Sequence, residues 1–194
     1  MIKVLYVHGY GGKENGTSSK LISKILNENG IEAEVYAPHI PFEDIEKATR
    51  FVVQAAEGVD LVIASSMGAL ISLLSCDHKK LLINIAFPDD IRRIAPEYSE
   101  SELNILDKRL SIKLDNVDFE DKYCMYFIFG KHDEVANNSK VISQLYNESH
   151  IYSVDDMGHS VDEHVSEKLI AAVRQILEDN KQKFTFYPFI DEDY

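Results

Sequence analysis

The chain has 194 residues, of which 45% are hydrophobic and 27% are charged, proportions that exclude a disordered or collagen-like protein. Acidic residues outnumber basic ones by 33 to 20, which gives a formal net charge of −13 at pH 7. A field of that sign repels phosphate groups, so we expect neither nucleic acid nor an anionic membrane surface as a partner. No charged leader with an apolar run and no bilayer-length apolar segment is found, so we expect a cytoplasmic protein.

Short β-rich runs alternate with helical patterns along the chain, which favours a single α/β domain over residues 1–183 with a mainly parallel sheet flanked by helices. Six strands are expected, at residues 2–8, 33–37, 60–64, 81–87, 124–129 and 151–154. Helices are expected at residues 18–29, 42–57, 67–75, 139–146 and 162–180. Cys76 and Cys124 stand in apolar runs, where a buried free thiol is the ordinary interpretation.

Two segments depart from this alternation. Residues 88–122 form a charged, lid-like insertion in which Leu103, Leu106 and Leu110 have a helical spacing. Helices over the mouth of the sheet and a long structural connection are both compatible with that pattern. The tail at residues 184–194 is aromatic and acidic together, so we expect it to pack on the domain or on a second copy in a homodimer.

The most specific motif reads A-S-S-M-G and stands between a buried strand and an apolar helix. It has the small-x-Ser-x-small form of a nucleophile elbow, a sharp strained turn with no room for bulky side chains two residues from the serine. Centring the motif on Ser66 places Ala64 and Gly68 at those positions, whereas centring it on Ser65 places larger side chains there. The motif therefore predicts Ser66 as a nucleophile; the simpler alternative is a serine pair that caps a helix.

A serine hydroxyl needs a base to remove its proton, and the chain offers seven histidines. His159 stands in M-G-H-S after the last predicted strand, at the sheet edge where open α/β sheets bind ligands. His78 and His164 are typical of solvated surface positions. His132 and His150 are disfavoured only by the order of the elements. His159 is therefore the predicted base.

The base in turn needs a carboxylate that fixes its tautomer and stabilises the imidazolium. Asp133 follows the predicted strand that ends F-I-F-G, on the same sheet edge as His159, and gives the order Ser, Asp, His along the chain. Glu134 is the adjacent fallback. Asp89 and Asp90, after the preceding strand, are weaker substitutes.

Two backbone N–H groups are needed for the negative oxygen of a tetrahedral intermediate. The amide of Met67, at the start of the elbow helix, is one candidate. The amide of Tyr10, in the turn H-G-Y-G-G after the first strand, is the other. A phosphate-binding loop is disfavoured there, because no Ser or Thr follows the lysine and the glycine spacing is wrong for a dinucleotide site.

The motifs V-H-G-Y, A-S-S-M-G, F-G-K-H-D and M-G-H-S, spread over residues 4–160, resemble the α/β-hydrolase superfamily. Within it, the chain is similar to the small bacterial esterases of the YqiA-like, UPF0227 type. The resemblance implies a Ser-Asp-His triad, hydrolysis of carboxylic esters or thioesters, and a lid at residues 88–122. Two N-terminal antiparallel strands of larger members have no counterpart here, and the tail does not map onto the family.

These residues together predict acyl transfer from a small ester or thioester to Ser66, with His159 as base and then acid and with Asp133 orienting His159. The amides of Tyr10 and Met67 would bind the oxyanion, and neither a cofactor nor a metal ion is expected. Two alternatives stay open. One is a binding protein with the hydrolase fold, and the other is an interaction protein that works through its aromatic tail.

Overall fold

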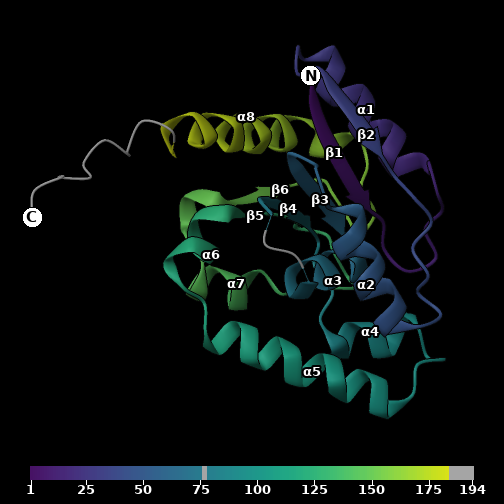
Figure 1. The fold of residues 1–194 in the computed structure, drawn as a ribbon. Helices are drawn as coiled ribbons and strands as arrows, with labels where there is room; N and C mark the ends of the chain where they lie inside the picture. Colours follow the sequence, from purple (N-terminus) through teal and green to yellow (C-terminus); the bar gives the residue numbers. More distant parts are fainter. Residues whose placement is uncertain (76–77, 184–194) are drawn as a thin grey trace, which may run out of the picture.

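A six-stranded sheet forms the centre of the protein, which is described here from a computed structural model that covers residues 1–75 and 78–183 (Figure 1). All neighbouring strands are parallel, in the order β2-β1-β3-β4-β5-β6. The strands are β1 (Ile2–Val7), β2 (Ala33–Tyr36), β3 (Leu61–Ser65), β4 (Lys80–Ile83), β5 (Met125–Gly130) and β6 (Ile151–Val154). The predicted α/β class and the parallel sheet are confirmed.

Helices cover both faces of the sheet, and alternate residues of each strand point to opposite faces. In β3, Val62 and Ala64 belong to one apolar cluster, while Leu61 and Ile63 belong to the other. The first cluster is completed mainly by α2 (Ile45–Ala55), α3 (Met67–Ser75) and α5 (Glu100–Asp115), with Ile142 of α7 (Ser139–Leu145). The second is completed by α1 (Thr17–Glu28) and α8 (Ser166–Lys183), which lie on the opposite face (Figure 1). The four central strands, β1, β3, β4 and β5, are buried on both faces over most of their length, which explains their almost continuous apolar sequences.

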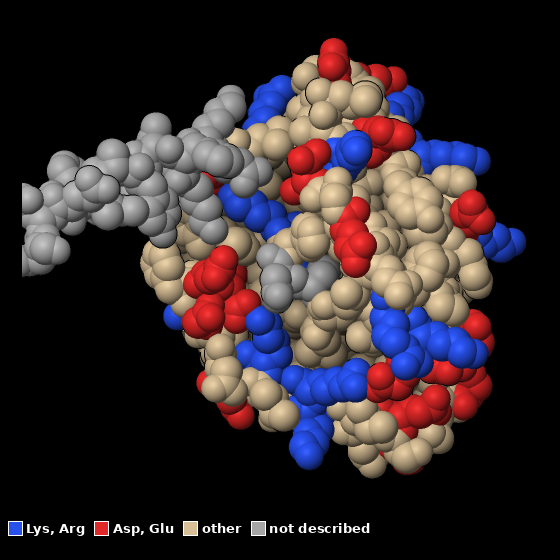
Figure 2. Space-filling view, in the orientation of Figure 1, with Lys and Arg blue, Asp and Glu red and all other residues tan. Residues whose placement is uncertain are grey.

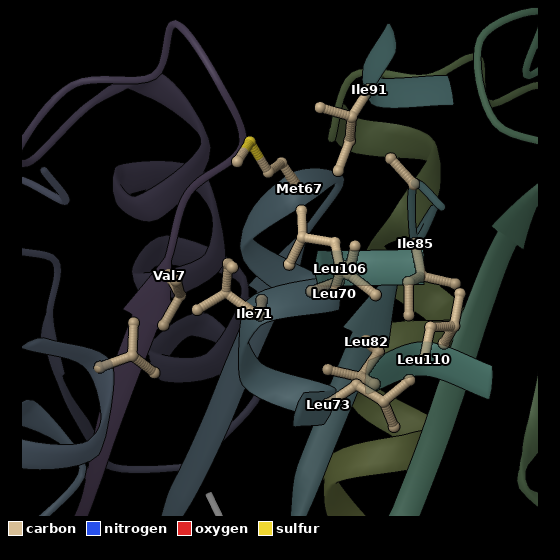
Figure 3. Packing of buried hydrophobic residues seen from close by; sticks show 14 of the residues in the cluster. Val7, Met67, Leu70, Ile71, Leu73, Leu82, Ile85, Ile91, Leu106 and Leu110 are labelled. Carbon is tan, nitrogen blue, oxygen red and sulfur yellow. The ribbon is translucent and has the colours of Figure 1, made fainter. Parts of the chain in front are cut away.

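Helix α3 lies deep in the first cluster and carries the residues that follow the elbow. Its side chains from Met67 to Leu73 are all buried. Figure 3 shows Met67, Leu70 and Ile71 among apolar side chains of the neighbouring strands and helices. Because protein interiors are close-packed, this surrounding fixes the position of the helix and of the turn before it.

The insertion at residues 88–122 folds into three helices, α4 (Pro88–Ile94), α5 (Glu100–Asp115) and α6 (Phe119–Cys124). Leu103, Leu106 and Leu110 are the buried face of α5, as their spacing predicts. Ser99 starts α5 with a capping box, because its side chain accepts from the Glu102 N–H and the Glu102 carboxylate accepts from the Ser99 N–H. In the region of these helices, basic and acidic side chains adjoin one another (lower part of Figure 2).

Several element boundaries differ from the prediction for local reasons. The strand expected at residues 81–87 ends at Ile83, because Asn84 has a left-handed backbone with φ of 47°. Helix α2 begins at Ile45, where the Asp44 side chain accepts a hydrogen bond from the Lys47 N–H. The final helix is preceded by a short 3₁₀ turn, Glu163–Val165, capped by Asp162.

Other expectations concern single residues and the tail. Cys124 is a buried free thiol, as predicted, whereas Cys76 lies outside the described residues. The tail at residues 184–194 also lies outside them, so the predicted docking and homodimer stay predictions. No helix among the described residues is long and apolar enough to cross a bilayer.

Candidate active site

The turn after β3 holds Ser66 in a left-handed backbone conformation, with φ of 54°. Such a conformation is rare for a residue with a side chain and costs about 1–3 kcal/mol, which the surroundings must offset. The Ser66 N–H donates to the Ile83 carbonyl of β4 at 3.0 Å, and the Ser66 carbonyl accepts from the Ala69 N–H at 3.0 Å. The strained turn predicted from the elbow motif is therefore present and is tied to both the sheet and α3.

Close approach of the backbone explains the small residues around this turn. A Cβ atom on Gly68 would lie 2.3 Å from the His8 carbonyl oxygen and 2.5 Å from that of Val7. A Cβ atom on Gly9 would lie 2.8 Å from the Cβ of Ser66. All three distances are shorter than real Cβ contacts, so the end of β1 can lie against the elbow only with glycine at these two positions.

A continuous chain of hydrogen-bonding distances joins three of the residues selected from the sequence. The Ser66 Oγ lies 2.8 Å from the His159 Nε2. The His159 Nδ1 lies 2.9 Å from one carboxylate oxygen of Asp133 and 3.1 Å from the other. These residues are far apart in sequence, and the carboxyl ends of β3, β5 and β6 bring them together. The arrangement has the nucleophile-base-acid geometry of a serine triad.

Asp133 is a buried carboxylate with a full set of donors. Its side chain is 2% exposed, and its Oδ1 accepts hydrogen bonds from the amides of Val135 and Ala136, each at 2.8 Å. Burial by itself would raise the pKa of this carboxyl. The hydrogen bonds from His159 and from the two amides outweigh burial and hold the pKa of Asp133 below its ordinary value. Asp133 is therefore ionised at neutral pH and faces the imidazole as an anion.

The competing serine and carboxylates have other partners. The Ser65 Oγ lies 2.8 Å from the buried Tyr6 hydroxyl on β1. Glu134 is exposed, and Asp89 is paired with Arg92 at 2.5 Å on the surface. Asp90 is buried, but it accepts from the Phe87 N–H, from Asn138 and from Arg93.

The histidines weighed against His159 also lie in other surroundings. His150 is buried and stacked on the Tyr126 ring, with centroids 4.0 Å apart. His132 is exposed, and the His164 ring lies beside Asp162, with Nδ1 at 3.1 Å from the carboxylate. None of these three histidines makes the hydrogen-bonding contact with the Ser66 Oγ that His159 makes.

The loop after β1 carries Tyr10, the predicted second oxyanion donor, next to the elbow. The buried His8 ring holds this loop: its Nδ1 is 2.8 Å from the Gly9 carbonyl, and its Nε2 is 3.4 Å from the Ile40 N–H. Burial lowers the pKa of His8, so a neutral ring that donates through Nδ1 and accepts through Nε2 satisfies both contacts. Within residues 1–75 and 78–183, neither the Tyr10 nor the Met67 amide donates to an acceptor of the protein, so both remain candidate oxyanion donors.

One aromatic side chain from the insertion, that of Tyr98, reaches the same loop. The Tyr10 ring contacts the edge of Tyr98, which lies between α4 and α5, with centroids 6.2 Å apart. The Tyr98 hydroxyl donates to the Phe42 carbonyl, and the Phe42 ring contacts the edge of His8. The connection between α4 and α5 thus packs against the loop after β1, while the body of α5 packs on α3 and α4. Tyr10 is 39% exposed, so part of this aromatic residue is open to solvent in the loop that lies against the elbow.

Asn84, which the sequence analysis did not select, also lies at this sheet edge. Its side-chain NH₂ donates to the carbonyls of Gly158, at 2.8 Å, and His159, at 2.9 Å, and its oxygen accepts from the Gly130 N–H at 2.8 Å. The signal in the sequence was a polar residue inside the apolar run L-L-I-N-I-A-F. Among the described residues, no three His, Cys, Asp or Glu side chains gather in a cluster that could hold a metal ion.

Comparison with known proteins supports the fold. No family model matches the chain, and no curated protein matches its sequence. Est1E from Butyrivibrio proteoclasticus, in a structure with bound ferulic acid, is similar over 93% of this chain and 90% of its own, with 18% identity and a TM-score of 0.70. The esterase domain of a Rhodothermus marinus protein is similar over 92% and 87%, with 17% identity and a TM-score of 0.64.

A third similar structure is the ydeN gene product of B. subtilis, which matches over 95% of this chain and 100% of its own, with 16% identity and a TM-score of 0.57. Further similar structures include an α/β hydrolase from a lagoon-sediment metagenome. At these identities the likeness concerns the fold, which is that of the α/β hydrolases. The narrower resemblance to the YqiA-like esterases finds no match among these comparisons and stays a prediction.

Proposed function

We propose that this protein is a serine hydrolase that cleaves a carboxylic ester or thioester through an acyl-enzyme on Ser66. The observation that carries the proposal is the unbroken chain from the Ser66 Oγ to the His159 Nε2, and from the His159 Nδ1 to Asp133. A neutral imidazole in that position can accept the hydroxyl proton, and an ionised Asp133 stabilises the imidazolium that results. Esterases among the structures of similar fold agree with this chemistry.

In the first half of the reaction, the Ser66 Oγ attacks the carbonyl carbon of the substrate while His159 takes the hydroxyl proton at Nε2. The carbonyl oxygen becomes negative, and the amides of Tyr10 and Met67 donate to it. The tetrahedral intermediate then collapses as the bond to the leaving group breaks. The His159 imidazolium gives its proton to the leaving alcohol or thiol, and the acyl group stays on Ser66.

In the second half, water replaces the leaving group. His159 accepts a proton from water, and the hydroxide oxygen attacks the acyl carbon. The same two amides bind the second oxyanion. Collapse of this intermediate breaks the bond to the Ser66 Oγ, which takes its proton back from His159, and the carboxylic acid leaves.

The aromatic pair at the loop after β1 guides the choice of substrates. Tyr10 is exposed and supported by Tyr98, and flat aromatic rings favour offset or edge contacts with an aromatic ligand. Est1E, of similar fold, binds ferulic acid. A screen should therefore include aryl-acyl esters beside short p-nitrophenyl esters, acyl thioesters and amides. Hydrolysis of esters or thioesters and not of amides is the expected result.

A fluorophosphonate probe tests the nucleophile, because it reacts with an activated serine and needs no knowledge of the substrate. The wild-type protein should be labelled, and Ser66→Ala should not. Ser65→Ala is the matched control, since it removes the neighbouring hydroxyl that pairs with Tyr6 and leaves Ser66 in place. Ser65→Ala should be labelled like the wild type.

Two outcomes would contradict the proposal. Labelling that survives Ser66→Ala and is lost in Ser65→Ala would assign the nucleophile to the other serine. A folded wild-type protein that is neither labelled nor active on any ester, thioester or amide would favour a binding protein built on the hydrolase fold.

A further inference from the structure

We propose that Asn84 is a positioning residue that fixes the loop of His159 to the strand end before Asp133, and thereby sets the geometry between base and acid. This inference rests on the proposed function of Ser66, His159 and Asp133. It adds a role for a residue at the end of β4, a strand that contributes none of the three.

The contacts of Asn84 join the two segments that carry the base and the acid. Its NH₂ group donates to the carbonyl of Gly158 and to the carbonyl of His159 itself. Its side-chain oxygen accepts from the N–H of Gly130, three residues before Asp133. One planar amide thus holds both segments at once, so that a shift of either one strains the same group.

The site requires an amide side chain rather than another polar group. Both carbonyls need donors and the Gly130 N–H needs an acceptor, and an amide offers two donors and one acceptor. An ionised aspartate would place a negative oxygen against two carbonyl oxygens in a fully buried position, because Asn84 is 0% exposed. Asparagine also tolerates a left-handed backbone better than most residues, and Asn84 has φ of 47°.

The surroundings of the His159 loop explain why this anchor matters for the base. The His132 N–H donates to the Met157 carbonyl at 3.1 Å, which holds the start of the loop. The next two carbonyls, those of Gly158 and His159, are held by Asn84. The His159 side chain is 22% exposed, so packing alone encloses it less than it encloses Asp133. A displacement of about 1 Å at a reacting group can lower a rate on the order of 100-fold.

Two substitutions at Asn84 test the inference. Asn84→Asp is isosteric and removes the donors. Asn84→Gly removes the side chain, suits the left-handed backbone and keeps the backbone N–H that donates to the Ile128 carbonyl at 2.9 Å. The matched control is Asn27→Asp, because the Asn27 amide also donates to two carbonyls, of Ser23 and Ala33, and accepts from an N–H, yet lies on α1.

Two readouts separate positioning from general stability. The first is the split between kcat and KM for an ester that the wild-type protein hydrolyses. The second is the low-field NMR signal of the proton between His159 and Asp133, assigned by its absence in His159→Ala; it needs no substrate. A folded Asn84 variant should lose on the order of 100-fold in kcat with KM changed less than about threefold, and should shift or lose the signal. Asn27→Asp should change neither.

Several results would overturn the inference. An unchanged kcat, an unchanged signal, or a rise of KM that accounts for the lost efficiency would show that Asn84 does not set the base-acid geometry. Failure of both variants to fold would make Asn84 a residue of general stability. A wild-type protein with the low-field signal but without hydrolysis would contradict the proposed function alone, and the NMR comparison would then decide the role of Asn84.

Discussion

Two neighbouring turns at the carboxyl edge of the sheet have the same backbone shape and different uses. Ser66 follows β3 with φ of 54°, and Asn84 follows β4 with φ of 47°. Among the described residues, the Ser66 hydroxyl pairs with the His159 ring, a group that can take its proton. Asn84 is fully buried and uses its whole side chain for contacts within the protein. We therefore propose that the left-handed backbone serves reactivity in one turn and cohesion in the other.

The largest expected effect is a loss of activity on removal of His159, the base beside the reactive turn. His159→Ala should lower kcat/KM on the order of 10⁴-fold, because Ser66 then has no group to take its proton. Adding Asp133→Asn should cost less than about a further tenfold, since residues that act as a unit have non-additive effects. Kinetics on the single and double variants check this. Full activity of His159→Ala would contradict the mechanism, and a loss in Glu134→Gln but not in Asp133→Asn would move the acid by one residue.

The next effect concerns how tightly the reactive turn is packed. Gly68→Ala should lower the free energy of unfolding by about 3 kcal/mol, because its Cβ would lie 2.3 Å from the His8 carbonyl oxygen. Gly30→Ala is the control, since Gly30 has φ of 76° and nothing within 4 Å of an added Cβ. It should cost about 1–2 kcal/mol from backbone strain alone. Urea unfolding measures both variants. Equal losses of unfolding free energy in Gly68→Ala and Gly30→Ala would show that the end of β1 is not packed tightly against the elbow.

A pair of glycine substitutions compares the two left-handed turns directly. Ser66→Gly relieves the strained backbone and gives up one hydrogen bond, so the unfolding free energy should change by less than about 1 kcal/mol. Asn84→Gly relieves less strain, because asparagine tolerates a left-handed backbone, and removes three hydrogen bonds, so it should destabilise the protein by about 2 kcal/mol. Urea unfolding measures both. A larger loss at Ser66 than at Asn84 would reverse the comparison.

The smallest expected effect is a change in stability with pH that comes from Asp133. The pKa of Asp133 is lower in the folded protein than its ordinary value of 3.8, so the ionised carboxylate stabilises the fold above that pH. The stabilisation is lost as the pH falls through the folded-state pKa. Asp133→Asn should therefore lower the unfolding free energy by about 1 kcal/mol at pH 7, and the difference should narrow below about pH 4. A difference that widens toward acid pH would contradict the charge assignment.

The comparison of the two turns also explains how much of the candidate site could be predicted from the sequence. The strained turn at Ser66 was predictable because a nucleophile elbow demands small neighbours at fixed spacing, and Gly68 supplies one. His159 and Asp133 followed from strand ends that meet at one edge of a parallel sheet. Asn84 belongs to no motif, and its role depends on carbonyls that only the folded loop of His159 brings within reach. The strand prediction therefore continued past it to residue 87.

The insertion at residues 88–122 marks a second limit. The spacing of Leu103, Leu106 and Leu110 left a helix and a long connection both open, and the structure shows a helix with these residues on its buried face. The contact of Tyr98 with Tyr10 could not be predicted, since it depends on where the turn between α4 and α5 meets the loop after β1. Local patterns therefore predicted the elements, and long-range packing decided which of them reach the site.

The most direct test of the central claim is to trap the acyl-enzyme. The protein is mixed with an activated ester that it hydrolyses, quenched in acid and digested, and the peptides are weighed by mass spectrometry. We predict that the mass of the acyl group appears on the peptide that contains Ser66 and is absent in Ser66→Ala. In His159→Ala, an activated ester can still acylate Ser66, but no base activates water to remove the acyl group, so the acylated peptide should accumulate. An acyl group on any other residue of the active wild-type protein would contradict the assignment of Ser66 as the nucleophile.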